Sequence, residues 1–141
     1  MKAPFRVGED KAMQEELLIV DEDKDCRKQM AEIFIDAGYD VTVTSSVASA
    51  LSGVIKKTAQ VVVLGSKTDE MSAADIIPLL KQCNRNLPII LVASDTSLGL
   101  LRKLRGAGVF YHAMKPVDAE DREEIRQAVL CAFKNLHTHV A

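Results

Sequence analysis

Polar and apolar positions along this chain follow two alternating patterns. Short apolar or β-branched runs occupy residues 17–20, 41–44, 60–64, 88–93 and 109–112. Runs of this length are typical of strands, and continuous apolar runs indicate strands buried on both faces. Between them, and after the last, apolar residues recur at helical spacing, which predicts helices over 25–37, 47–57, about 72–83, 97–105 and from 119 onward.

Residues with strong terminal preferences mark the ends of these helices. Gly38 follows the first helix as a stop, and Asp118 precedes the last as a cap. Ser72 with Asp75 resembles a capping box, and Pro78 is expected to bend the helix that follows.

Strands that alternate with helices predict a doubly wound α/β fold, with a parallel sheet covered on both faces. The 141 residues suit one domain, which we place at 16–136, after a loose lead-in of 1–15 and before a tail of 137–141. In such folds, functional groups collect where the strands end, at their carboxyl edge.

Composition excludes several classes of protein. The formal net charge of −2 does not suggest nucleic-acid binding, and no apolar run is long enough to cross a bilayer. The amino-terminal residues lack the apolar stretch of a signal peptide, so cytoplasmic residence is the default expectation. The cysteines Cys26, Cys83 and Cys131 lack the spacing of a disulfide framework or a zinc site.

Three segments at strand ends carry the candidate chemistry. Asp21 and Glu22 follow the first strand, Gly65 follows the third, and Lys115 precedes Pro116 after the fifth. Together they resemble the receiver domain of bacterial two-component response regulators. The resemblance covers about residues 16–136, and it implies a flavodoxin-like, CheY-like sheet with strand order 2-1-3-4-5.

The resemblance also implies a role for each of these positions. In receivers, the acidic pair binds Mg²⁺, the lysine contacts a phosphoryl group, and an Asp at the end of the third strand accepts that group. Gly65 stands at the acceptor position and has no side chain that could form an acyl phosphate. With one carboxylate missing, we expect Asp21 and Glu22 to hold Mg²⁺ weakly if at all, and no other cofactor. Lys115 is then expected to pair with Asp21 or Glu22. Taken alone, Asp21 and Glu22 would equally fit a solvated strand end whose negative charge stabilises the start of the following helix.

Further positions depart from the receiver pattern. Ala93 stands where a Thr or Ser hydroxyl normally ends the fourth strand, and Ser94 would reach that place only by a register slip. His112 replaces the usual Tyr or Phe of the switch position. In the loop after the third strand, only Met71 matches the Met-Pro pattern of the family.

Several alternatives stay open. A displaced acceptor such as Asp69 would need a loop carboxylate held with great accuracy, and Ser66 would point to the opposite side. An enzyme or nucleotide binder on the same layout is disfavoured, because no GxxxxGK[ST], GxGxxG or GxSxG motif occurs. The chain is also compatible with the receiver fragment of a larger transcriptional regulator.

We therefore interpret the chain as a pseudo-receiver, which is not an enzyme and acts as a protein-interaction module in phosphorelay signalling. Receivers meet partners, or a second copy, through the fourth helix, fifth strand and fifth helix. That resemblance selects a candidate face for a signalling protein or a homodimer, with no role in binding nucleic acid or membrane. Its residues are Leu98, Leu101, Arg102, Lys103, Tyr111, His112 and Arg126.

Overall fold

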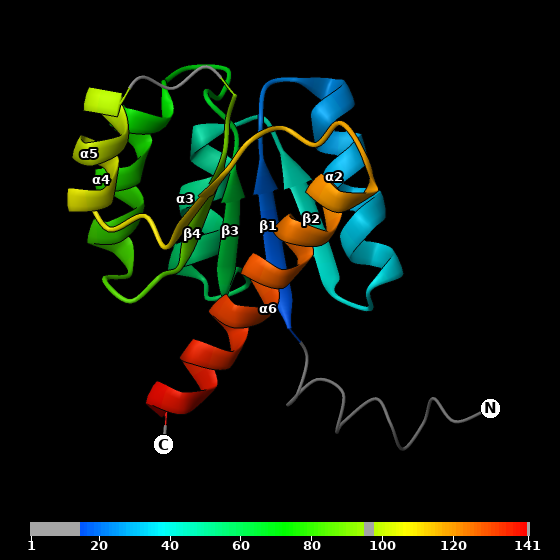
Figure 1. Cartoon of the computed structure of the whole chain (residues 1–141). Helices are drawn as coiled ribbons and strands as arrows, with labels where there is room; N and C mark the ends of the chain where they lie inside the picture. Colours follow the sequence, from blue (N-terminus) through cyan, green and yellow to red (C-terminus); the bar gives the residue numbers. More distant parts are fainter. Residues whose placement is uncertain (1–14, 95–97, 141) are drawn as a thin grey trace.

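The computed structural model describes residues 15–94 and 98–140, without the side chains of 98 and 138–140. Five parallel strands form one sheet in the order β2-β1-β3-β4-β5, which confirms the expected fold class (Figure 1). The expected lead-in lies mostly outside the described residues. No helix in the described part of the chain has the length and apolar character needed to cross a membrane.

Strands and helices alternate along the chain, as the sequence pattern predicts. The strands are β1 Glu16–Val20, β2 Asp40–Thr44, β3 Val61–Leu64, β4 Ile89–Val92 and β5 Tyr111–Ala113. The helices are α2 Lys24–Asp36, α3 Val47–Ile55, α4 Ala73–Cys83, α5 Leu98–Gly106 and α6 Ala119–Val140. The fourth expected helix is therefore α5, and the last is α6.

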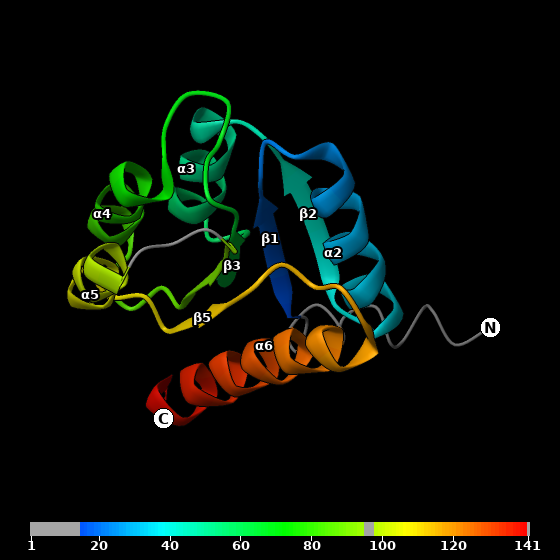
Figure 2. The same ribbon diagram turned by 45° about the horizontal axis from the view of Figure 1, so that its top comes forward.

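The alternating side chains of β1 supply both halves of the core. Leu18 and Val20 pack toward α3 and α4, whereas Leu17 and Ile19 pack toward α2 and α6. Figure 2 shows α2 and α6 on one side of the sheet and α3 and α4 on the other. Burial on both faces explains the continuous apolar runs of β1, β3 and β4.

Three local expectations differ from the structure. The fifth strand begins at Tyr111 instead of Val109, because the amide of Val109 bonds to Leu104 O and closes the end of α5. Helix α6 continues to Val140, so residues 137–140 are helical and not a tail. The Ser72 side chain caps no backbone amide of α4, because its hydroxyl donates to the Asp75 carboxylate at 3.2 Å.

Candidate functional site

Strand pairing brings the ends of β1 and β3 together at the carboxyl edge of the sheet. Val20 lies opposite Leu64, and the Gly65 amide donates to Val20 O at 2.8 Å. Asp21 and Gly65 are thus neighbours across the sheet, although 44 positions separate Gly65 from Asp21 in the numbering. The structure brings these two predicted residues together.

The Asp21 side chain occupies the space that a side chain at position 65 would need. A Cβ added to Gly65 would lie 2.6 Å from Asp21 Oδ1, and closer still to Cγ and Oδ2. Asp21 is only 4% exposed, and its Oδ1 accepts a hydrogen bond from the Asp23 amide at 2.9 Å. The acceptor position is therefore filled by a buried carboxyl from the neighbouring strand.

Burial controls the acid–base properties of this carboxyl. Desolvation raises the pKa of Asp21, and the hydrogen bond from the Asp23 amide, the Cys26 thiol and Lys115 oppose the shift. The thiol of the buried Cys26 lies beside it. Desolvation, followed by the negative charge of Asp21, raises the pKa of Cys26 to about 12. Cys26 is therefore an unreactive thiol at neutral pH.

Lys115 pairs with Asp23, which corrects the expectation of a pair with Asp21 or Glu22. Its Nζ lies 3.4 Å from Asp23 Oδ2. Asp21 is buried, and Glu22 extends toward Lys67, with 3.8 Å between Glu22 Oε2 and Lys67 Nζ. Only the fold could show which of the three consecutive acids meets the lysine.

Asp23 is the site residue that the sequence reasoning missed. It caps α2, because its carboxylate accepts from the amides of Asp25 at 3.0 Å and Cys26 at 3.2 Å. The bond from the Cys26 amide, with that from Lys115, lowers the pKa of Asp23. Desolvation disfavours the Lys115 ammonium, but the bond to Asp23 and the nearby acids raise the pKa of Lys115 overall. An Asp two residues before a predicted helix was the available signal.

The arrangement does not fit the Mg²⁺ ion that receivers bind. Within the described residues, no group of three His, Cys, Asp or Glu side chains is placed to hold a metal ion. Asp21 is buried, Asp23 is engaged by Lys115 and the α2 amides, and Glu22 is directed toward Lys67. A hard cation needs several oxygen ligands around one point, and these carboxylates do not converge on one.

The two predicted switch-like positions contact each other. Ala93 is buried, and its carbonyl oxygen lies 2.9 Å from His112 Nε2, so the His112 ring of β5 is held beside the end of β4. The Ser94 hydroxyl accepts from the Lys115 amide at 3.1 Å. Ser94 therefore fixes the loop that carries Lys115.

The loop after β3 is organised around Thr68. This side chain is 2% exposed, and its hydroxyl accepts from the Met71 amide at 3.1 Å while donating to Met71 O at 3.1 Å. The amide of the exposed Asp69 donates to Ser45 O at 2.9 Å, which ties the loop to the end of β2. The structure shows no contact between Asp69 and Lys115, and Ser66 is exposed beside Gly65.

The predicted partner face separates into two parts. Arg102, Lys103 and Tyr111 are exposed on α5 and β5, with Leu101 and His112 half-buried; the Leu98 side chain lies outside the described residues. Arg126 does not join them, because it lines a hollow with Ile33 and Asp36 of α2 and bonds to Glu123 at 2.7 Å.

Glu124 takes the place on α6 that the sequence assigned to Arg126. It accepts a hydrogen bond from the Tyr111 hydroxyl, and that bond is the main cause that raises the pKa of Tyr111. Helical geometry explains the difference, because residues two positions apart face nearly opposite directions.

Comparisons with known proteins agree with this fold. The chain is 29% identical over 117 residues to sporulation initiation phosphotransferase F of Bacillus subtilis, covering 83% of this chain and 92% of that protein. It is 24% identical over 102 residues to the DNA-binding transcriptional regulator NtrC of Rhizobium meliloti. The latter match covers 72% of this chain but 21% of the relative.

Solved structures share the fold. The receiver domain protein (CheY-like) from Methanospirillum hungatei is similar with a TM-score of 0.74 at 21% identity, over 86% of this chain and 98% of that chain. The receiver domain of an HD domain-containing protein from Pseudomonas fluorescens gives 0.79 at 19% identity, over 89% and 98%. The family model of the response regulator receiver domain matches residues 17–129. The chain therefore belongs to the response regulator receiver domain family of two-component signalling.

Proposed function

We propose that this chain is a pseudo-receiver, a signalling module that takes no phosphoryl group and works through protein contacts. The observation that carries the proposal is the pair Asp21 and Gly65. Gly65 has no acceptor group, and the buried Asp21 carboxyl fills the space beside it. An acyl phosphate needs an exposed carboxylate next to a metal ion and a lysine, and Asp21 is 4% exposed.

The displaced acceptor Asp69 has less support. Its amide is tied to Ser45 O, and its loop is fixed by the buried Thr68. The relative from Bacillus subtilis carries the name phosphotransferase, but transfer requires a residue that first receives the group. We therefore do not extend phosphotransfer, or any other enzymatic activity, to this chain.

Treatment with acetyl phosphate in excess Mg²⁺, followed by intact-mass spectrometry, tests the proposal. A receiver that has Asp at the end of its third strand is the positive control under the same conditions. We expect no phosphoryl adduct on this chain. A stable single adduct mapped to Asp69 or Asp21 would overturn the pseudo-receiver proposal and favour the displaced acceptor.

The surface that we propose for partner contacts is the α5–β5 face, defined here as Leu101, Arg102, Lys103, Tyr111 and His112. It offers an exposed aromatic ring, Tyr111, and the exposed cations Arg102 and Lys103. Tyr and Arg are enriched among the residues that concentrate binding energy at interfaces. Tyr111 is 39% exposed, and its hydroxyl is fixed by Glu124. A fixed ring loses little entropy on binding, which favours contact with a signalling protein or a second copy.

Two variants separate this face from the acidic pocket. Arg102→Glu with Lys103→Glu and His112→Ala should weaken partner capture or self-association, and Asp21→Asn should leave both nearly unchanged. Partner binding is measured by capture from native extract, with the captured partner identified. Self-association is measured by sedimentation velocity of the pure chain. Loss of binding by the Asp21 variant, with retention by the face variant, would assign function to the acidic pocket instead.

A further inference from the structure

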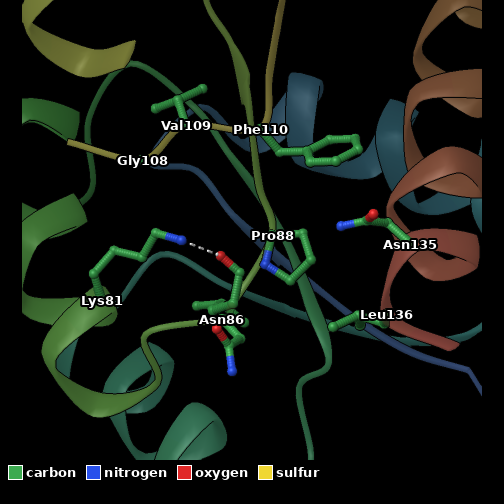
Figure 3. A pocket seen from close by; sticks show the side chains of 9 residues that line it. Lys81, Asn86, Pro88, Gly108, Val109, Phe110, Asn135 and Leu136 are labelled. Carbon is green, nitrogen blue, oxygen red and sulfur yellow. Dashed lines mark hydrogen bonds between the residues drawn. The ribbon is translucent and has the colours of Figure 1, made fainter. Parts of the chain in front are cut away.

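A hollow of about 680 Å³ lies at the opposite, amino edge of the sheet. Figure 3 shows Lys81 of α4 and Asn135 of α6 extending into it from opposite sides, with Phe110 above Asn135. The floor includes Pro88, at the start of β4. This hollow is separate from Asp21 and Lys115, which lie where the strands end.

A second hollow of about 610 Å³ adjoins the first, because Asn86 and Leu136 line both. It continues past Arg85 to the end of α3, where Ile55 and Lys57 lie. The two hollows together form an elongated depression, which we call the amino-edge groove. Its principal residues are Ile55, Lys57, Lys81, Arg85, Phe110 and Leu136.

Positive charge predominates along this groove. Its described lining residues include Lys57, Lys81 and Arg85, and none of them is Asp or Glu. In the described part of the chain, neither Lys57 nor Arg85 forms an ion pair with a carboxylate. At one rim, His137 lies 4.0 Å from Glu15, a contact that is ionic only when the histidine is protonated.

The central cation of the groove is held rigidly. Lys81 Nζ donates to Leu87 O at 2.8 Å and to Arg85 O at 3.2 Å, so the lysine fixes the loop that forms the groove wall. Gly108 makes room for it, because a Cβ there would lie 2.6 Å from Lys81 Cε. A groove whose wall is fixed before binding loses less entropy when it binds a ligand.

Amide and apolar side chains complete the lining. Asn84, Asn86 and Asn135 offer donors and acceptors of the kind that satisfy a peptide backbone. Ile55 and Phe110 are 63% and 38% exposed, and they supply apolar contact at the two ends. An elongated shape, positive charge and amides favour an extended chain over a compact small molecule.

We propose that the amino-edge groove binds an acidic linear segment of a partner protein, with carboxylates toward Lys57 and Arg85 and apolar side chains toward Ile55 and Phe110. This site is additional to the α5–β5 face and does not depend on the state of Gly65. Charge complementarity identifies the occupant, since a cationic wall without carboxylates attracts acidic partners and repels basic ones.

The probe is a fluorescein-labelled short peptide that alternates Glu and Leu, compared with the same peptide carrying Gln for Glu. Fluorescence anisotropy is measured with the full chain at low and physiological ionic strength. We expect saturable binding of the Glu peptide that weakens with salt, and much weaker binding of the Gln peptide. Lys57→Glu with Arg85→Glu should reduce affinity for the Glu peptide by about tenfold or more.

A matched control reverses two exposed lysines elsewhere, Lys24→Glu with Lys28→Glu on α2, and circular dichroism verifies that both variants fold. Phe110→Ala should weaken binding while the charges stay in place. Amide resonances of Asn86 and Asn135 should shift when the peptide is added. The proposal is overturned if the unaltered chain does not bind the Glu peptide, or if it binds the Gln peptide with equal affinity. It is also overturned if the control variant loses as much affinity for the Glu peptide as the groove variant does. Displacement by equimolar inorganic phosphate would also overturn it, since the site would then bind small anions.

Discussion

The two edges of the sheet differ in how their charged side chains are matched. At the carboxyl edge, Asp23 and Lys115 form an ion pair, and the Asp21 carboxyl is buried and bonded to the Asp23 amide. At the amino edge, Lys57 and Arg85 lie along an open groove that has no carboxylate among its described lining residues. The charged groups at the carboxyl edge thus contact one another, whereas those at the amino edge line an open groove.

If the chain is a pseudo-receiver, as we propose, this difference indicates how the fold is kept with glycine at position 65. Without a side chain at position 65, space opens beside Asp21, and a void in a packed region is costly. The Asp21 carboxyl fills that space. Under the proposed function, charged partners are bound at other surfaces.

The largest expected effect concerns the rigid wall of the groove. Gly108→Ala should lower the free energy of unfolding by about 3 kcal/mol, because φ is +102° and Lys81 Cε crowds the new Cβ. Gly106→Ala, with nothing within 4 Å, is the matched control and should be tolerated. Urea denaturation measures both, and equal stability of the two variants would show that the wall is loose.

The second largest effect is expected for the packing between Gly65 and Asp21. Gly65→Ala should cost about 2 kcal/mol, because its Cβ displaces the Asp21 carboxyl. In an Asp21→Ala background the same change should instead stabilise by about 0.5 kcal/mol, through the smaller entropy of the unfolded chain. The four proteins form a double-mutant cycle in urea.

Gly53→Ala in α3 is the control for this cycle, since the nearest atom to its new Cβ is at 3.7 Å. It should be neutral or stabilising in both backgrounds. An unchanged cost of Gly65→Ala after removal of the Asp21 side chain would mean that Asp21 does not fill the acceptor space.

A smaller effect is expected in the pH dependence of stability, which tests the burial of the Asp21 carboxyl. Burial raises the pKa of Asp21 above 3.8 in the folded chain, so the folded state keeps this proton at pH values where the unfolded state has lost it. The free energy of unfolding should therefore fall as pH rises from about 3.8 through the folded pKa, and then level off.

Asp21→Asn removes this dependence. The variant should gain stability relative to the unaltered chain between acidic and neutral pH, and the lowered pKa of Asp23 contributes equally to both proteins. Thermal unfolding across that range gives the comparison. A difference that does not change with pH would contradict the raised pKa of Asp21.

The smallest effect is expected for the ion pair at the surface of the carboxyl edge. Lys115→Met should change the free energy of unfolding by less than about 1 kcal/mol, because both side chains of the pair are more than a third exposed. Asp23→Ala should cost more, about 1 kcal/mol, since it also removes the cap of α2. Chemical denaturation at two salt concentrations distinguishes them, because only the ion pair is screened.

Local patterns predicted most of the fold. The order of strands and helices, the burial of β1, β3 and β4 on both faces, and the Asp118 cap all depend on residues close in the chain. The predicted start of β5 was wrong because the Val109 amide bonds to Leu104 O at the end of α5 and not to a strand, and the apolar pattern does not distinguish these two partners. The assignment of Arg126 to the partner face was wrong, because the rotation of a helix about its own axis depends on what packs against it.

Local pattern is sufficient to place Gly65 directly after a buried strand and to bring acids and a lysine to the same edge of the sheet. Their spacing along the chain and the parallel layout are sufficient for that conclusion. The tertiary structure alone decided that Asp21 fills the space at Gly65, that Asp23 pairs with Lys115, and that cations line the opposite edge. These outcomes depend on side-chain volume and charge meeting across the sheet, between residues that no local pattern connects.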